Sequence, residues 1–339
     1  MARREDHHDP LPIPNGWFAV AWSRELHAGD VRPIHYFGQD MVLFRTRSGQ
    51  ARVLDAFCPH LGAHLGYGGR VMGETVRCPF HGWQYDGTSG DCVHIPYCEK
   101  IPRRAQLRSW DVQEKNGMVF VWHHAETKPP DWDFPVLPEI GSSEWSEPRT
   151  HELEMEAYVQ DTHENNNDPV HFQYVHGMVA TPPSEIRYSQ DSTHYQITST
   201  SEQVTPLGTF QLTLVRDSWG LGLTAVRSVG IPDAGLLMYS STTPIDETRV
   251  HSRWLLTATN NLVDIAGEDF MKALTQGVQQ DMPIWRNKVH RARPVLCEAD
   301  TFLAEFRQWA RQFYCQPPAA SRPARSEPKA SEDRTGGRG

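Results

Sequence analysis

The chain of 339 residues lacks three features that would define its class at once. It has no excess of positive charge, because 33 Lys and Arg stand against 42 Asp and Glu, so we expect no nucleic-acid partner. No apolar run approaches the roughly 20 residues that a membrane-spanning helix needs. No apolar stretch follows Arg3 and Arg4, as a secretory signal requires, and we therefore predict a cytoplasmic protein.

Cysteine is also scarce, whereas histidine is abundant. The chain has six Cys and 17 His. In a protein predicted to be cytoplasmic, so few cysteines are typical of thiols or metal ligands rather than of a disulfide framework. This imbalance indicates metal binding, and the spacing of the Cys and His residues indicates the kind of metal site.

Changes in composition divide the chain into five segments. Residues 1–14 are polar and are expected to form a flexible lead. Short apolar runs separated by Gly, Asp and Asn predict an all-β domain at 15–127. Four prolines in the eleven residues 128–138 predict a linker. A second domain is expected at 139–315, and the tail 316–339, which lacks Val, Ile, Leu, Met, Phe, Trp and Tyr, is expected to be disordered.

The second domain combines strands and helices. Apolar and polar residues alternate between about 194 and 259, which predicts antiparallel strands with one buried, mostly uncharged face. Helices are predicted at about 267–291 and 301–313. Strands followed by helices indicate the α+β class.

The most specific motif combines two cysteines with two histidines. Cys58-Pro59-His60 is followed, after seventeen residues, by Cys78-Pro79-Phe80-His81. Each half supplies one thiolate and one imidazole, which is the ligand set of a Rieske [2Fe-2S] centre, where neutral imidazoles raise the reduction potential. Zinc is the alternative, but zinc fingers pair Cys with Cys and His with His, so the spacing favours the cluster.

These two loops resemble those of Rieske proteins. Respiratory and photosynthetic members carry one more Cys in each loop, where this chain has Ala63 and Phe80. The resemblance is therefore to the oxygenase and ferredoxin branch. A Rieske ferredoxin would end near residue 120, which leaves most of the chain for another task.

A second motif supplies two further histidines. Asp168 can cap a short helix that begins at Pro169 and contains His171. On a regular helix His176 would lie about 140° away from His171, so we expect the helix to end near Gly177 and His176 to turn back. Two imidazoles and one carboxylate make the facial triad of non-haem Fe(II) oxygenases.

The carboxylate has to come from another part of the chain. Asp281 lies on the apolar stripe of the helix predicted at 267–291, together with Phe270, Leu274, Val278 and Trp285. A buried carboxylate needs a cation or hydrogen bonds to compensate it. We therefore predict Asp281 as the third iron ligand, with a hydrogen-bonded core Asp, or a helix distortion at Pro283, as the alternative. His163, at the wrong spacing, is expected near the site or at the surface.

Asp168-x2-His171-x4-His176 with the later Asp281 resembles the motif of Rieske non-haem iron oxygenases. The resemblance implies a helix-grip-like catalytic domain, a [2Fe-2S] cluster, Fe(II), and O₂ as co-substrate. It also implies electrons that come from NAD(P)H through a flavin reductase or a ferredoxin. A homotrimer is implied as well, in which Asp168 links the partner subunit's His81 to His171.

The segment from Asp281 to Asp300 is similar to ketosteroid hydroxylases and cholesterol 7-desaturases, and also to oxidative cyclases of prodiginine biosynthesis. The predicted function is therefore that of a terminal oxygenase that oxidises a C–H bond of a large hydrophobic, steroid-like or sterol-like substrate. Desaturation or oxidative cyclisation is the alternative reaction. A Rieske electron carrier without oxygenase activity and a lipid-binding module remain as other classes.

Overall fold

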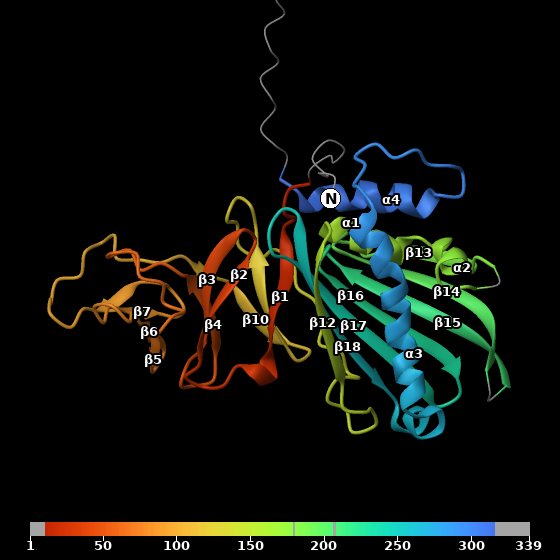
Figure 1. Ribbon diagram of the computed structural model, residues 1–339, viewed down its shortest axis with the longest axis horizontal. Helices are drawn as coiled ribbons and strands as arrows, with labels where there is room; N and C mark the ends of the chain where they lie inside the picture. The colour runs from red at the N-terminus through yellow and green to blue at the C-terminus, as the bar shows by residue number, and fades with distance from the viewer. Residues whose placement is uncertain (1–10, 179, 206–207, 316–339) are drawn as a thin grey trace, which may run out of the picture.

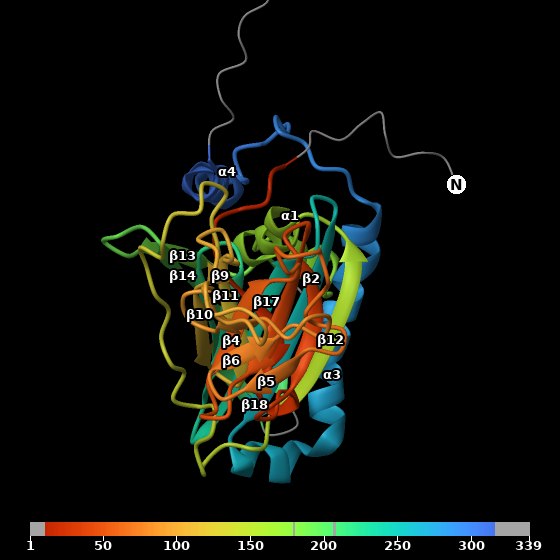
Figure 2. The same cartoon turned by 90° about the vertical axis from the view of Figure 1, so that its left-hand side faces the viewer.

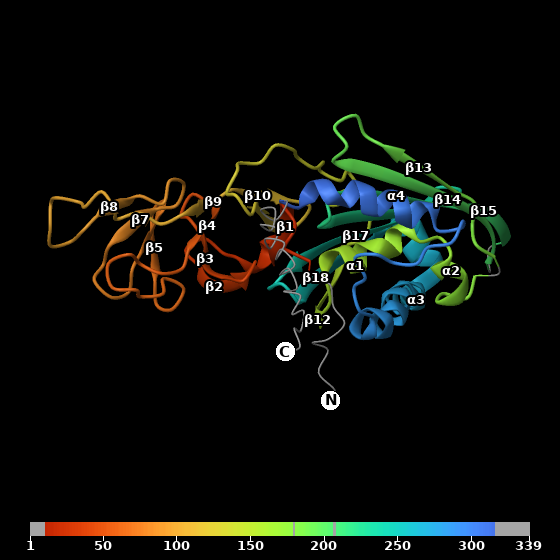
Figure 3. The ribbon, with the colours of Figure 1, turned by 90° about the horizontal axis from the view of Figure 1, so that it is seen from above.

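The computed structural model describes residues 11–178, 180–205 and 208–315. They form two parts that follow one another along the longest axis of the molecule (Figures 1 and 3). The tail expected at 316–339 and most of the lead expected at 1–14 lie outside the described residues. No helix of the described part is long and apolar enough to cross a bilayer.

The first part is built from strands, as predicted. Its described residues form three antiparallel sheets with the orders β1-β11-β10, β2-β3-β4-β9 and β5-β6-β7-β8. The elements are β1 (Gly16–Trp22), η2 (Ser23–Glu25), β2 (Val31–Tyr36), β3 (Gln39–Arg45), β4 (Ala51–Asp55), β5 (Arg70–Met72), β6 (Thr75–Arg77), β7 (Gln84–Asp86), β8 (Cys92–His94), β9 (Ser109–Trp110), β10 (Val112–Lys115) and β11 (Met118–His123). The sheet of β5 to β8 lies at the far end of the molecule (Figures 1 and 3).

The second part is a seven-stranded antiparallel sheet with the order β12-β18-β17-β16-β15-β14-β13. Its strands are β12 (Arg149–Glu156), β13 (Ser184–Tyr188), β14 (His194–Thr205), β15 (Gly208–Trp219), β16 (Leu223–Ile231), β17 (Ala234–Pro244) and β18 (Arg249–Ala258). The helices are α1 (Val159–Glu164), η3 (Asn165–Asn167), α2 (His171–Tyr174), α3 (Asn260–Asn287), α4 (Thr301–Ala310) and η4 (Arg311–Phe313). The long helix α3 crosses one face of the sheet (Figure 1), and the α+β class is confirmed.

The alternation of side chains gives this sheet two buried faces. On one face, apolar residues of β15 to β18 pack against the β1 and β11 side of the first part, among them Trp219, Leu223, Tyr239 and Leu255. The opposite face lies under the helices. Because successive side chains of a strand point to opposite sides, each strand serves both interfaces.

The junction between the two parts is bonded through the backbone of Ala19 in β1. Its N–H donates to Ser241 Oγ at 2.9 Å, and its carbonyl accepts from Thr243 Oγ1 at 2.6 Å and from Arg253 Nη1 at 2.9 Å. The Pro-rich segment 128–138 contains neither strand nor helix. Phe134 within it is only 3% exposed, so this segment is packed against the core rather than free.

Figure 2 looks at the molecule from the end where the sheet of β5 to β8 lies. In this view helix α3 lies behind these strands and to one side of them (Figure 2). It covers the face of the seven-stranded sheet that is turned away from the first part (Figure 3). The loops that carry the Cys and His pairs are thus at one end of the molecule. Helix α2, which begins at His171, lies near the other (Figure 1).

Candidate metal centres

The two loops that carry the Cys and His pairs have the same hydrogen-bonding pattern. In the first, Cys58 N–H donates to Ala63 O at 2.9 Å and Gly62 N–H to Cys58 O at 2.9 Å. In the second, Cys78 N–H donates to Trp83 O at 2.7 Å and Gly82 N–H to Cys78 O at 3.2 Å. Gly62 and Gly82 have φ values of 75° and 74°, a conformation that L side chains rarely adopt.

The four side chains of these loops converge, with the thiols inside and the rings outside. Cys58 and Cys78 are 2% and 1% exposed, whereas His60 and His81 are half-buried. The two imidazole centroids are 4.7 Å apart. Burial raises the pKa of the Cys78 thiol, and the neighbouring Cys58 adds to this rise. Two adjoining buried thiols are costly as thiolates unless iron compensates their charge, so this donor set fits a [2Fe-2S] cluster.

Neighbouring aromatic side chains hold the cluster loops in place. The His60 ring stacks on Trp83 with a centroid distance of 4.5 Å and an interplanar angle of 7°. Tyr85, which is completely buried, places its hydroxyl 3.0 Å from Cys58 Sγ. A hydroxyl that donates to a cluster sulfur stabilises negative charge there, which is a known means of tuning the potential. None of the six cysteines forms a disulfide.

The second set of predicted ligands also comes together. One donor atom from each of His171, His176 and Asp281 lies within 4.8 Å of the other two. The rings of His171 and His176 have centroids 5.1 Å apart and an interplanar angle of 74°. His176 Nε2 lies 3.5 Å from Asp281 Oδ1. The structure therefore brings a carboxylate of α3 to two histidines that are more than one hundred residues away in the sequence.

The hydrogen bonds of both histidines leave Nε2 available. His171 Nδ1–H donates to the backbone carbonyl of Asp168, and His176 Nδ1–H donates to Gln280 Oε1 at 2.9 Å. Metal-binding histidines ordinarily donate their second ring N–H in this way, which sets the tautomer and the ring orientation. Burial lowers the pKa of His171, whereas the Asp281 carboxylate raises that of His176. The site is thus poised to bind a cation.

Asp281 provides the test of whether a metal fits. The residue is 7% exposed, and its Oδ1 has no hydrogen-bond donor among the described residues. A buried carboxylate oxygen without a donor is expensive unless a cation compensates it. Two neutral imidazoles and this carboxylate fit Fe(II) in a facial triad. Of the predicted apolar stripe, Trp285 is buried, and the side chains of Phe270, Leu274 and Val278 lie outside the described residues.

Asp168 caps the short helix that carries His171. Its Oδ1 accepts the backbone N–H of Val170 at 2.9 Å and that of His171 at 3.2 Å. The helix begins at His171 rather than at Pro169 and ends at Tyr174, and Gly177 follows with a φ of 71°. Because the helix has only one turn, His176 is free to fold back to His171, as the position of Gly177 predicts.

A buried ionic network fixes the end of α3 against α1. Asp161 and Glu164 of α1 are both buried, and Lys288 Nζ lies 3.3 Å and 3.4 Å from their carboxylates. His290 Nδ1 lies 3.0 Å from Asp161, and Arg307 of α4 lies 2.8 Å from Glu164. This network fixes the register between the segment of Asp281 and the segment that leads to Asp168, so the triad does not depend on the metal alone.

Two residues near the iron triad were missed by the sequence analysis. Gln280 bonds His176, and its position next to Asp281 was a usable signal. Arg216 of β15 had no such signal, because an Arg in an alternating strand ordinarily faces solvent. It is 1% exposed, its guanidinium lies 5.1 Å from the centre of the Phe172 ring, and burial lowers its pKa to about 10. Arg216 thus packs against Phe172, the residue that follows His171.

His163 is buried against the core of the second part. It is 5% exposed, stacks on Phe306 with a centroid distance of 5.6 Å, and has no hydrogen-bond partner for Nε2 among the described residues. Desolvation lowers its pKa to about 3. His163 is therefore neutral in the folded protein at neutral pH.

This burial predicts an acid-sensitive fold. Between pH 6.5 and about 3 the unfolded chain binds a proton at His163 that the folded chain does not. The free energy of unfolding therefore falls as the pH falls, by up to about 1.4 kcal/mol per pH unit. In urea titrations at pH 7 and pH 5, His163→Phe is expected to lose less stability than the wild type. The exposed His27→Phe serves as the control, and an unchanged loss in His163→Phe would contradict the assignment.

Comparisons with known proteins agree with both centres. Residues 16–111 match the Rieske [2Fe-2S] domain, and residues 121–314 match the 3-ketosteroid 9alpha-hydroxylase C-terminal domain. Cholesterol 7-desaturase nvd 1 of Ciona intestinalis is 30% identical, over 93% of this chain and 72% of its own length. The oxygenase component of 3-ketosteroid-9-alpha-monooxygenase of Rhodococcus rhodochrous is 28% identical, over 88% and 82%.

The solved structure of NdmB from Pseudomonas putida CBB5 has the same fold. It superposes with a TM-score of 0.72 at 20% identity and covers 89% of this chain and 93% of its own. Together with the two domain matches, this agreement confirms the predicted family, the cluster and Fe(II) as cofactors, and the enzyme class. The chain belongs to the Rieske non-haem iron oxygenases with a 3-ketosteroid 9alpha-hydroxylase type of C-terminal domain, and it is an oxidoreductase.

Proposed function

We propose that the protein is the terminal oxygenase of a multicomponent system that oxidises a C–H bond of a steroid-like or sterol-like substrate. Cys58, His60, Cys78 and His81 hold the cluster, and His171, His176 and Asp281 hold Fe(II). The cluster supplies single electrons, and Fe(II) supplies O₂ activation. The observation that carries the proposal is the convergence of His171 and His176 with Asp281, whose buried Oδ1 has no hydrogen-bond donor among the described residues.

Hydrogen bonds orient the two histidines that would hold Fe(II). His171 and His176 are fixed by the Asp168 carbonyl and by Gln280, so their lone pairs point to one place. Among the described residues, three donors converge here, and a facial triad of this kind would leave Fe(II) positions open for O₂. Electrons come from outside, since the Rhodococcus relative is named an oxygenase component, and a ferredoxin or flavin reductase is the proposed donor.

The arrangement of the two centres favours an oligomer. The cluster loops lie at one end of the elongated molecule and α2 lies near the other (Figure 1). Both ends expose apolar side chains: Leu61 and Phe80, which adjoin His60 and His81, are 64% and 59% exposed, and Tyr174 of α2 is 78% exposed. Exposed apolar residues of this kind mark docking surfaces. We propose a head-to-tail ring of three subunits. In this ring the cluster loops of one subunit lie against α2 of the next, so that the cluster of one subunit is close to the iron of its neighbour.

In this ring the carboxylate of Asp168 is the proposed link between centres. Asp168 is half-buried, caps His171 through its own side chain, and bonds the His171 ring through its carbonyl. The partner subunit's His81 would reach it from the exposed end of the cluster loops. A short path then joins the cluster of one subunit to the iron of the next, because the carboxylate of Asp168 would accept from the partner subunit's His81 and its backbone carbonyl bonds the His171 ring.

The substrate class rests on the relatives, and a cavity beside His176 provides the space for a large substrate. The cavity has a volume of about 670 Å³. His176 lines it, as do Gly177, Met178, residues 180–183, and the residues Thr200, Ser201, Glu202 and Gln211 of β14 and β15. Sites of this size suit ligands as large as a steroid. The relatives are named for cholesterol and 3-ketosteroids, so a large, mainly apolar substrate is the best-supported choice.

The test is a turnover assay with the purified chain, a surrogate reductase, NADH and O₂. Sterols, 3-ketosteroids and prodiginines are incubated separately and the products are measured by mass. A gain of 16 mass units indicates hydroxylation, and a loss of 2 indicates desaturation or ring closure. Asp281→Asn is the matched inactive control. Turnover of only small polar aromatic compounds would contradict the proposed substrate class.

A further inference from the structure

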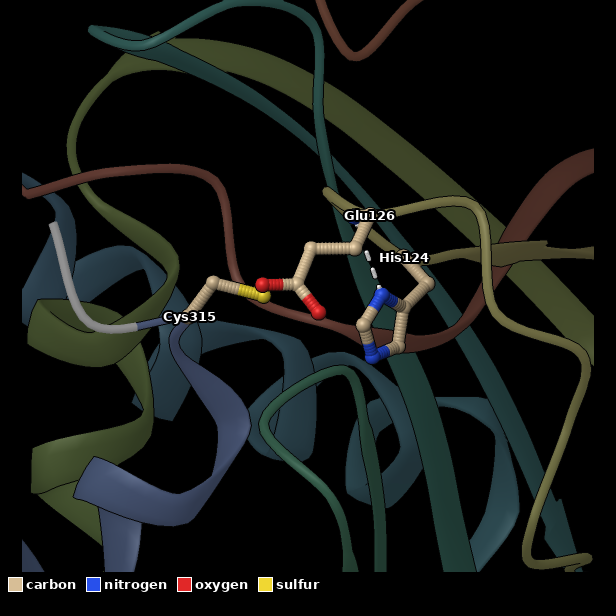
Figure 4. A group of neighbouring side chains, drawn as sticks. All are labelled: His124, Glu126 and Cys315. Atoms are coloured by element: carbon tan, nitrogen blue, oxygen red, sulfur yellow. Dashed lines mark hydrogen bonds between the residues drawn. The ribbon is translucent and has the colours of Figure 1, made fainter. Parts of the chain in front are cut away.

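A second set of metal-binding side chains lies where the two ends of the described chain meet. His124 and Glu126 stand in the turn that follows β11, and Cys315 is the last described residue (Figure 4). One donor atom of each lies within 4.8 Å of the other two. Among the described residues, the iron triad is the other group of three that meets this condition. No role in the proposed oxygenase reaction accounts for these three side chains.

Asn15 holds the two segments together. Its Oδ1 accepts the backbone N–H of Ala125 at 2.9 Å, and its Nδ2 donates to Cys315 Sγ at 3.5 Å. Its own N–H donates to the carbonyl of Phe313 at 2.6 Å. Asn15 is 8% exposed, so these bonds lie in a largely dry setting. The N–H that points at the sulfur stabilises the thiolate, which is the form that binds metals.

The three donor types select among metals. A thiolate, an imidazole and a carboxylate together suit Zn²⁺, whereas Ca²⁺ and Mg²⁺ require oxygen donors and iron–sulfur clusters require mainly thiolates. We propose that Cys315, His124 and Glu126 form a Zn²⁺ site that is separate from both iron centres. Bound Zn²⁺ fastens the end of the second part to the turn after β11 of the first part, with water as the fourth ligand.

Two existing interactions compete with the metal. Lys128 Nζ lies 2.7 Å from Glu126 Oε2, and the backbone N–H of Glu126 donates to His124 Nδ1 at 3.0 Å. The side chains of Lys128 and Glu126 are 64% and 56% exposed, so their ion pair is screened by water and is readily exchanged. Zn²⁺ binding is therefore expected to be reversible, and removal of the Lys128 charge is expected to strengthen it.

The chain contains internal controls for a test by thiol labelling. Cys98 and Cys297 are exposed, and among the described residues neither belongs to such a cluster of donors. The intact holoprotein is treated with iodoacetamide at pH 7 with and without Zn²⁺, and labelling rates are read for each cysteine by peptide mass spectrometry. Zn²⁺ is expected to slow labelling of Cys315 about tenfold or more, and to leave Cys98 and Cys297 unchanged.

The variants separate this site from adventitious zinc. His124→Gln and Glu126→Gln are both expected to remove the protection of Cys315, and Lys128→Met is expected to shift protection to lower Zn²⁺ concentrations. Iron content and the visible spectrum of the cluster verify that each variant is folded and loaded. Equal protection of all three cysteines, no protection of Cys315, or protection that survives in both His124→Gln and Glu126→Gln would each overturn the proposal.

Discussion

Asp281→Asn is expected to abolish turnover while the protein keeps its fold and its cluster. The amide is a weak neutral ligand, so the two remaining imidazoles bind Fe(II) poorly. Iron analysis should then give the two irons of the cluster but not the third. Because Asp281 is buried and Oδ1 has no donor among the described residues, the metal-free variant is expected to be at least as stable as the metal-free wild type.

The control for this variant lies on the same helix. Asp264 is an exposed carboxylate of α3, and Asp264→Asn is expected to retain all iron and full turnover. The electron paramagnetic resonance spectrum of the reduced cluster should be identical in both variants. Full iron content in Asp281→Asn would show that Asp281 is an ordinary core carboxylate, and would reject the assignment of the triad.

Asp168→Asn is expected to uncouple two intact centres. Asparagine is as good a helix cap as aspartate, so the bonds to Val170 and His171 are retained and both iron sites should fill. The amide NH₂ replaces the second carboxylate oxygen, which is the acceptor proposed for the partner subunit's His81. Turnover is expected to fall about 100-fold, the upper range for loss of a residue that supports a metal ligand. Rapid mixing should show the reduced cluster oxidised correspondingly slowly by O₂ in the presence of substrate.

A matched capping aspartate provides the control for Asp168. Asp246 accepts the backbone N–H groups of Thr248 and Arg249 in the same manner, in a turn between β17 and β18. Asp246→Asn is expected to have wild-type turnover. If Asp168→Asn behaves like Asp246→Asn, the role of Asp168 is limited to capping.

Mixed oligomers test the path between subunits directly. A Cys78→Ala chain lacks the cluster, and an Asp281→Asn chain lacks the mononuclear iron, so neither is active alone. Co-expression is expected to restore part of the turnover, because one chain supplies the cluster and its neighbour supplies the iron. No recovery in co-purified oligomers would contradict electron transfer across the subunit contact.

Much of the fold could be predicted because it depends on local rules. Alternation between 194 and 259 indicated the strands that became β14 to β18, since period-two burial is a property of the strand itself. Helix boundaries were less accurate: α3 begins at Asn260, several residues before the predicted start. The Pro-rich segment was expected to be only a linker, but Phe134 packs into the core, because burial depends on contacts far away in the sequence.

The sequence by itself determined the chemistry of the two iron centres, since ligand type and spacing within each loop are local. The tertiary structure decided which segments far apart in the sequence come into contact. It showed that α3 delivers Asp281 to His176, that Arg216 is buried beneath Phe172, and that Cys315 meets His124 and Glu126. Each of these is a contact between segments far apart in the chain, and the packing of a whole sheet under its helices sets such distances.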